Sequence, residues 1–232
     1  MDKVYQISLL QALVNGYFDG VITTDELKKY GNTAIGTFDG ADGELIMLDG
    51  VIYKAKVDGN VEVITSDKIP FSNVTTFTPD DKINLSISDI NDLKDKLNKY
   101  NSNNKNMLIC IKINGLFKQI TVRSIPKQNK PYKNLNYVVE HEQKTYTYNN
   151  LEGTLVGFCF PYYLDKINSS DYHMHFISKD KTKGGHVLGL TFDNLDCLIS
   201  IKNKLELILP NTDSFKEKNY NINQELVKKV EE

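Results

Sequence analysis

Asp-Gly dipeptides recur at short intervals in the first third of the chain, next to runs of residues that favour β-strands. The dipeptides are Asp39-Gly40, Asp42-Gly43, Asp49-Gly50 and Asp58-Gly59, and the runs are residues 33–38, 44–48, 51–56 and 61–64. Glycine accepts positive φ at little cost, so Asp-Gly between two such runs favours a tight hairpin turn. The sequence therefore predicts an antiparallel meander over residues 33–64.

Helices are expected on either side of this meander. Ile7, Leu10 and Val14 recur at helical spacing and predict a short first helix. Thr23 followed by Glu26 is a candidate capping box for a helix over residues 25–30. The other expected helices are one capped by Ser88 with Ile90, Leu93 and Leu97 on one face, one over residues 135–143, and one over residues 224–230 capped by Asn223.

Strand patterns dominate the second half of the chain. Asn114-Gly115 lies between the β-type runs 107–113 and 116–124 and predicts a hairpin. Further strands are expected over residues 154–160, 172–178, 186–192 and 197–209. This order of elements indicates an α+β fold of mixed, largely antiparallel β-sheets with peripheral helices.

The stretch Asn101-Ser102-Asn103-Asn104 predicts a loop, and we place a division of the chain there. Residues 1–103 would form an N-terminal part of meander and helices. Residues 104–232 would form a β-rich part that carries all four histidines. The alternative is that the two parts form one compact unit.

Charge and composition exclude several classes of protein. The formal net charge is −2, which argues against a general nucleic-acid binder, because such proteins concentrate basic residues on one face. No apolar run is long enough to span a bilayer, and the first residues lack the features of a secretory signal. We therefore expect no membrane partner and a cytoplasmic location. Cys110, Cys159 and Cys197 are odd in number and lie in apolar stretches, so they are expected to be small buried hydrophobic residues.

Three of the four histidines fall within a short segment of the chain. Residues i and i+2 of a strand point to the same face, so His173 and His175 can direct two imidazoles to one place. A polar loop ending in Gly184-Gly185 can return His186 beside them as the next strand of a hairpin. Three imidazoles with an open fourth position are typical of a catalytic zinc site, although imidazole also accepts iron, manganese or nickel. The alternative interpretation is a set of surface or hydrogen-bonded histidines without a metal.

Two charged residues are candidate partners of such a metal. Glu44 follows the Asp42-Gly43 turn at the start of a predicted strand. Arg123 is the only arginine of the chain, and a guanidinium at a strand end can bind a carboxylate with two parallel hydrogen bonds. Taken alone, Glu44 can equally be a solvated turn residue and Arg123 a surface ion-pair partner.

Segments along nearly the whole chain together resemble the alpha-acetolactate decarboxylase family. The matching segments are Ile35-Gly36-Thr37-Phe38-Asp39-Gly40, Asp42-Gly43-Glu44, Leu48-Asp49-Gly50, Arg123-Ser124-Ile125-Pro126-Lys127-Gln128, Lys130-Pro131-Tyr132, Glu152-Gly153-Thr154-Leu155-Val156-Gly157-Phe158, Tyr172-His173-Met174-His175-Phe176-Ile177-Ser178 and Gly184-Gly185-His186-Val187-Leu188. Each segment is short, and their joint order and spacing make the resemblance specific.

The resemblance implies a zinc enzyme that converts 2-acetolactate to acetoin and carbon dioxide, in the branch leading towards butanediol. It implies a two-part fold of the family's kind, a small-molecule substrate and a homodimer. The residues it implies are His173, His175 and His186 as zinc ligands, Glu44 and Arg123 as catalytic residues, Arg123 and Thr37 as substrate-binding residues, and Glu231, with Glu232 as the alternative, as a catalytic glutamate from the C-terminal tail.

Two other functions fit the histidines. A cupin-like metal-dependent oxygenase or isomerase also uses a His-x-His strand with a third histidine, but it usually places a glutamate a few residues later, and none occurs here before His186. A structural or regulatory metal site in a binding protein would give metal-dependent stability without turnover. Neither accounts for the matching segments outside the histidines.

Overall fold

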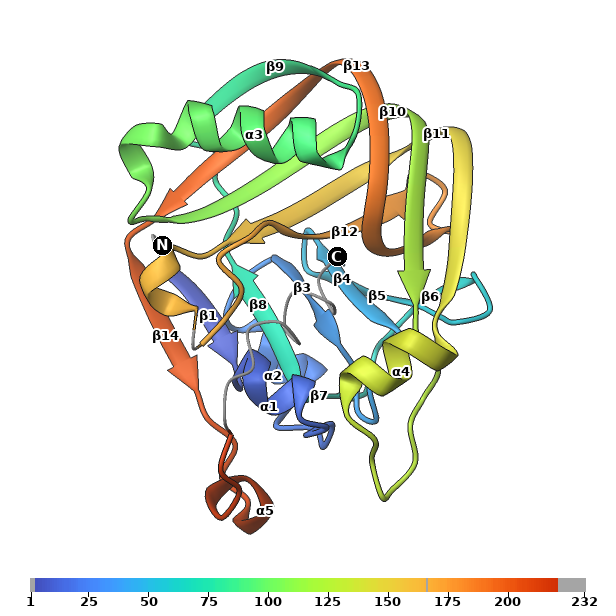
Figure 1. The fold of residues 1–232 in the computed structure, drawn as a ribbon, viewed down its shortest axis with the longest axis vertical. Coiled ribbons are helices and arrows are strands. Elements are labelled where there is room, and N and C mark those ends of the chain that lie inside the picture. The colour runs from blue at the N-terminus through green and yellow to red at the C-terminus, as the bar shows by residue number, and fades with distance from the viewer. Residues whose placement is uncertain (1–2, 166, 221–232) are drawn as a thin grey trace.

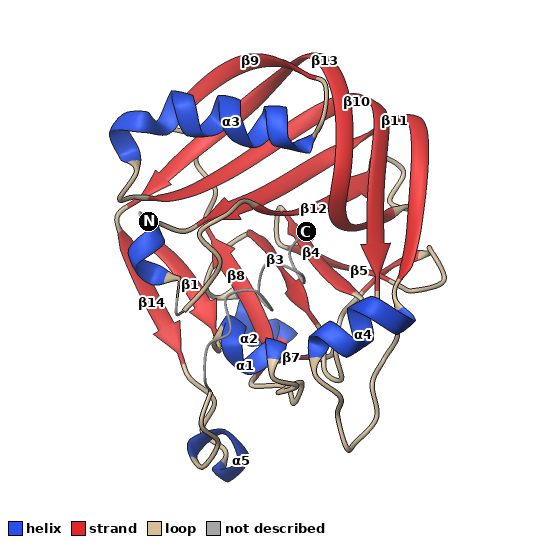
Figure 2. Ribbon diagram, viewed as in Figure 1, coloured by secondary structure: helices blue, strands red, loops and turns tan. Residues whose placement is uncertain are grey.

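The computed structural model describes residues 3–165 and 167–220, and its strands form two large sheets that face each other (Figure 1). Figure 2 shows the strands at the centre of the molecule and the helices around them. The helices are α1 (Leu10–Val14), α2 (Thr24–Lys28), α3 (Ile90–Tyr100), α4 (Leu135–Glu142) and α5 (Asp213–Lys216), with short 3₁₀ turns at Asn101–Asn104 and Tyr162–Leu164. Among the described helices, none is both long and apolar enough to cross a bilayer.

The first sheet has seven strands in the order β14-β1-β8-β3-β4-β5-β6. Its strands are β1 (Lys3–Ile7), β3 (Thr33–Thr37), β4 (Glu44–Leu48), β5 (Val51–Ala55), β6 (Val61–Val63), β8 (Phe71–Thr75) and β14 (Lys204–Ile208). All neighbours are antiparallel except β1 and β14, which are parallel. The predicted meander is confirmed as β3 to β6, whose central strands β3 and β4 are buried along their whole length.

The second sheet has five strands in the order β10-β11-β12-β13-β9. Its strands are β9 (Asp81–Ile87), β10 (Leu108–Ser124), β11 (Lys144–Cys159), β12 (His173–Ser178) and β13 (Gly184–Lys202), and a separate small ladder joins β2 (Ile22–Thr23) to β7 (Lys68–Ile69). Strand β10 pairs with β11 along its length and also with both ends of β13. These pairings close β10, β11, β12 and β13 into a ring.

Apolar side chains fill the space between the sheets. Ile35 and Ile46 of the first sheet pack in one buried cluster with Val156 and Ile177 of the second. The outer face of the second sheet is covered by α3, which buries Leu93 and Leu97. The α+β class, with largely antiparallel sheets and peripheral helices, is confirmed.

Several local predictions are also confirmed. Helix α2 begins with the reciprocal capping box of Thr23 and Glu26, and α4 lies where the sequence predicts a helix. Cys110 and Cys197 are buried and Cys159 half-buried, and burial raises the pKa of each thiol to about 12. The predicted helix over residues 224–230 lies outside the described residues.

The hairpin predicted at Asn114-Gly115 is wrong, because β10 runs through these residues without a turn. Gly115 pairs with Gly153 of β11 and has φ of +152°. A Cβ atom on Gly115 would lie 2.3 Å from the side chain of Leu195. Gly115 therefore makes room for the Leu195 side chain of β13. In the sequence, a glycine needed for this reason cannot be distinguished from one needed for a turn.

Three other boundaries are wrong. Ile7 belongs to β1, so the first helix is only α1. Asp89, not Ser88, caps α3, because its carboxylate accepts hydrogen bonds from Asn91 and Asp92. The strand predicted over residues 197–209 is divided at Asn203 between β13 and β14, which lie in different sheets.

Strands β9 and β14 each cross the division proposed at residue 103, because each lies in the sheet formed mainly by the other part of the chain. Strand β9 precedes that residue and lies in the second sheet, and β14 follows it and lies in the first. Whether the chain divides there into two folding units stays a prediction.

Candidate metal centre

Strands β12 and β13 bring the three clustered histidines together. His173 and His175 lie two residues apart on β12, and His175 is directly opposite His186 of β13. One nitrogen of each ring lies within 4.8 Å of the others, and the Nε2 atoms of His173 and His175 are 3.1 Å apart. All three side chains are buried. The convergence that the spacing predicts is therefore present, and the role of these residues as metal ligands stays a prediction.

Burial keeps the rings of β12 neutral. It lowers the pKa of His173 to about 3, with a further contribution from the nearby Arg123 guanidinium. Burial also lowers the pKa of His175 well below its usual value, with smaller contributions from His173 and Arg123. A metal requires an unprotonated imidazole, so these rings are in the form that binds one.

A contact with the first sheet orients His175. Its Nδ1 atom lies 2.9 Å from the main-chain oxygen of Leu45 on β4. A carbonyl oxygen can only accept, so Nδ1 carries the proton and the lone pair is on Nε2. Such an outer hydrogen bond is typical of metal-binding histidines, because it sets both the tautomer and the ring orientation.

The donor set fits a zinc ion. Zinc binds imidazole nitrogen at about 2.0–2.1 Å, so two ligands of one tetrahedral ion lie about 3.3 Å apart. The separation of 3.1 Å between His173 and His175 Nε2 is close to this value. Three buried nitrogen donors also leave a coordination position for a substrate.

Glu44 and Arg123 lie beside the histidines. Glu44 is the first residue of β4. Its Oε2 atom is 3.5 Å from His175 Nε2, and its Oε1 atom is 3.6 Å from a terminal nitrogen of Arg123. Arg123 lies near the end of β10, directly opposite His186. Their exposed fractions are only 6% for Glu44 and 4% for Arg123. The alternatives of a solvated turn residue and a surface ion pair are therefore wrong.

Thr37 lies opposite Glu44 on β3 and lines the same cavity. Its hydroxyl donates to the main-chain oxygen of Gly43 at 2.7 Å. The structure thus brings together every described residue that the sequence analysis proposes for the site. Glu231 and its alternative Glu232 lie outside the described residues.

Gly36 and five apolar side chains also line the cavity, and none of the five is a site residue predicted from the sequence. They are Leu13 of α1, Ala41, Phe71 of β8, Ile125 and Leu135 of α4. Of these five residues, only Ile125 has a signal in the sequence, because it lies two residues after Arg123 in a matching segment. The cavity therefore combines a charged end at Glu44 and Arg123 with an apolar wall.

Comparisons with known proteins identify the family of the chain and match its fold. The family model described as Alpha-acetolactate decarboxylase matches residues 4–222. The alpha-acetolactate decarboxylase of Methanosarcina mazei is 37% identical over 216 residues, covering 92% of this chain and 74% of the relative, and that of Brevibacillus brevis is 38% identical over 214 residues, covering 91% and 74%. The crystal structure of alpha-acetolactate decarboxylase from Bacillus subtilis strain 168 superposes with a TM-score of 0.94 at 34% identity and covers 99% of each chain.

Proposed function

Since the chain belongs to the alpha-acetolactate decarboxylase family, we propose that it converts 2-acetolactate to acetoin and carbon dioxide with a zinc ion held by His173, His175 and His186. The observation that carries the proposal is the convergence of three buried imidazoles beside Glu44 and Arg123, with His173 and His186 lining the same cavity as these two charged residues. Such a site can hold a metal and a small anion at the same time.

Loss of carbon dioxide leaves an electron pair on the carbon skeleton next to the former ketone. The barrier is largely the energy of the resulting enolate-like species. When bound, zinc supplies a Lewis acid that withdraws charge from this part of the substrate.

Arg123 orients the departing carboxylate. Its guanidinium is buried and always charged, and its planar donors match the two carboxylate oxygens. Glu44 lies beside it at 3.6 Å and partly balances its charge. The substrate carboxylate is therefore not stabilised so strongly that its loss becomes difficult, because ground-state binding alone does not lower the barrier.

Glu44 takes up a proton from water and delivers it to the carbon that has lost the carboxyl group. Its position on one side of the cavity directs this proton to one face of the substrate, so the acetoin formed is chiral. Glu231 is the alternative proton donor, with Glu232 next to it. Thr37 contacts the substrate from β3. Its hydroxyl donates its proton to the Gly43 oxygen, so the hydroxyl oxygen is left to accept a hydrogen bond from the substrate.

The direct test is to mix purified, zinc-loaded protein with racemic 2-acetolactate and to measure acetoin with and without a chelator. We expect acetoin formation that stops in chelator and returns when zinc is added. Absence of acetoin from zinc-containing protein would overturn the proposal. Iron content with oxygen consumption would favour a cupin-like oxygenase, and metal-dependent stability without turnover would favour a structural site.

Two further features remain proposals of the same kind. We expect a homodimer, which light scattering of the purified protein can test. We also expect a cytoplasmic location, with neither nucleic acid nor membrane as a partner.

A further inference from the structure

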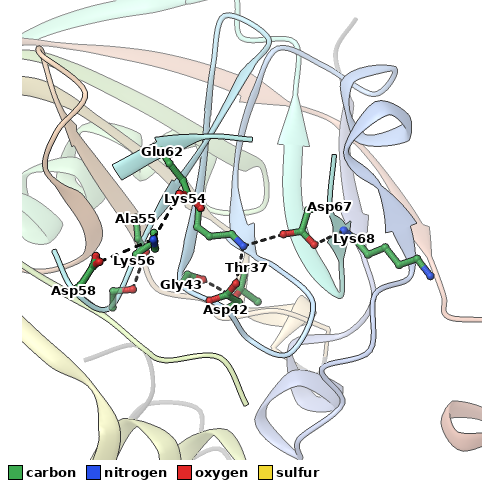
Figure 3. A network of polar contacts seen from close by, with 11 residues as sticks. Thr37, Asp42, Gly43, Lys54, Ala55, Lys56, Asp58, Glu62, Asp67 and Lys68 are labelled. Carbon is green, nitrogen blue, oxygen red and sulfur yellow. Dashed lines mark hydrogen bonds and ion pairs between the residues drawn. The ribbon is translucent and has the colours of Figure 1, made fainter. Parts of the chain in front are cut away.

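Lys54 is a buried lysine close to the site but outside the cavity wall. It lies on β5, directly opposite Leu45, and only 5% of its surface is exposed. Its Nζ atom is 2.7 Å from Asp42 Oδ2 and 2.9 Å from Asp67 Oδ2 (Figure 3). The same atom lies over the Phe38 ring. Burial lowers the pKa of this amine, but the two carboxylates outweigh that effect and the pKa is raised, so the amine is charged.

The Lys54 amine holds the turn that leads into Glu44. Residues 38–43 connect β3 to β4, and Asp42 and Gly43 are the last two residues before Glu44. Along β4, Glu44 points to the opposite face of the sheet from Leu45, whose strand partner is Lys54. The ion pair therefore restrains the turn from the face of the sheet that is remote from the substrate.

The same turn is restrained from the cavity side. The main-chain oxygen of Gly43 accepts from the Thr37 hydroxyl at 2.7 Å, and its nitrogen donates to the Ile125 oxygen at 3.2 Å. Gly43 has φ of +74°, and a Cβ atom there would lie 2.5 Å from the Ala55 oxygen. The turn also has main-chain hydrogen bonds such as Asp42 N to Phe38 O, and the Asp42 side chain adds an ion-pair anchor to Lys54.

Asp67 provides a fixed point for Lys54. Its main-chain oxygen accepts from the nitrogen of Thr24 at the start of α2, and its Oδ1 atom accepts from the nitrogen of Lys68. The lysine thus connects the turn before Glu44 to a second, independently fixed segment (Figure 3).

We propose that Lys54 is a positioning residue, which through Asp42 fixes the turn before Glu44 and so sets the place of the Glu44 carboxylate beside His175 and Arg123. This inference rests on the proposed function for its effect on turnover. Ion pairs often contribute little net stability, so the contact of one buried amine with both aspartates points to a geometric role. A displacement of about 1 Å at a catalytic group can reduce turnover by about 100-fold.

The test compares Lys54→Met, Lys54→Arg and Asp42→Asn with the matched control Lys56→Met. Lys56 follows β5 by one residue and pairs with Asp58 and Glu62 at the exposed surface (Figure 3). For each zinc-loaded variant, kcat, KM, zinc content and melting temperature are measured, with kinetics taken well below the melting transition. A crystal structure of Lys54→Met gives the position of Glu44 independently of turnover.

For Lys54→Met and Asp42→Asn we expect kcat to fall by about 10- to 100-fold while KM and zinc content stay close to the parent values. Lys54→Arg should recover most of kcat, because its guanidinium can still join both aspartates, and Lys56→Met should match the parent. In the crystal, Glu44 should leave its 3.5 Å contact with His175.

Parental kcat in Lys54→Met, even with a lower melting temperature, would show a merely structural ion pair and would overturn the inference. If Lys54→Met does not fold, parental kcat in Asp42→Asn overturns it equally. If the parent forms no acetoin, the proposed function fails, and an unmoved Glu44 in the variant crystal still decides against positioning.

Discussion

At the scale of single residues, burial determines what the histidines can bind. An exposed histidine titrates near neutral pH, but burial lowers the pKa of His173 to about 3 and that of His175 well below its usual value. The hydrogen bond from His175 to Leu45 leaves Nε2 with a lone pair. His173 and His175 are thus in the form that can bind a metal, and the first two predictions concern His175 and Glu44.

Replacing His175 with Ala should remove bound zinc and reduce turnover by more than about 100-fold, because a ligand and its contact to Leu45 are lost together. The matched control is His141→Ala, since His141 is exposed on α4 and lies outside the cluster. Metal analysis and acetoin assays measure both effects. Full zinc content in His175→Ala would contradict the ligand assignment.

Replacing Glu44 with Gln should leave zinc bound but slow turnover by roughly 100-fold, because the amide cannot deliver a proton. Glu62→Gln is the control, because Glu62 is an exposed carboxylate on β6 of the same sheet. Metal analysis checks that zinc stays bound, and steady-state kinetics measure the loss of turnover. An unchanged kcat would remove Glu44 from the proton transfer.

The sequence predicts site residues that lie in local patterns and not those that depend on distant contacts. His173, His175 and His186 follow from strand periodicity and one hairpin. Leu13, Phe71 and Leu135 reach the cavity from α1, β8 and α4, and no local pattern marks them. Lys54 likewise resembles any strand lysine until Asp42 and Asp67 are placed beside it.

At the scale of elements, the start of β13 is packed tightly against β10. Gly185 precedes His186 and has φ of +152°. A Cβ atom at Gly185 would lie 2.5 Å from the Arg123 main-chain oxygen. The close approach of these two strands therefore sets how near His186 comes to the Arg123 segment.

Gly185→Ala should destabilise the protein by about 2 kcal/mol, because of the strained φ and the backbone clash. In a chain of this size the melting temperature would fall by about 4–8 °C. Gly189→Ala on the same strand is the control, since its nearest neighbour, Thr121, would be 3.8 Å from the new Cβ. Equal melting temperatures for both variants would show that the strand approach is adjustable.

Element boundaries show the same limit of local patterns. The capping box of α2 and the meander β3 to β6 are specified by neighbouring residues, and both are predicted correctly. Asn114-Gly115 has the residues of a turn, yet β10 continues because Gly115 accommodates Leu195 of β13. That requirement comes from a strand about 80 residues away, which a local pattern does not contain.

At the scale of the whole molecule, each sheet takes a strand from a distant part of the chain. Strand β14 completes the first sheet beside β1, and β9 joins the second beside β13. The pairings β1 with β14 and β9 with β13 join strands that are far apart in the sequence, so no local pattern contains them. Composition and periodicity therefore give the α+β class but not this strand order.

One prediction concerns the proposed tail glutamate, Glu231 or its alternative Glu232, which lies outside the described residues. Ending the chain at Val230 should reduce turnover at least about 10-fold while the melting temperature stays near the parent value, because the tail glutamate proposed as a proton donor is lost. Single variants Glu231→Gln and Glu232→Gln identify which residue is responsible. Parental kinetics in the truncated protein would exclude a role for both.

Zinc should also stabilise the assembly of the two sheets, because its ligands lie on β12 and β13 of one sheet while His175 donates to Leu45 of the other. A ligand that binds only the folded protein at about 100 times its Kd adds about 2.7 kcal/mol of stability. Removing zinc with a chelator should therefore lower the melting temperature by about 5–10 °C.

The His141→Ala control should respond to the chelator as the parent does, and His175→Ala should not respond. A parent whose melting temperature is unchanged after loss of its zinc would show that the site contributes to chemistry but not to the joining of the sheets.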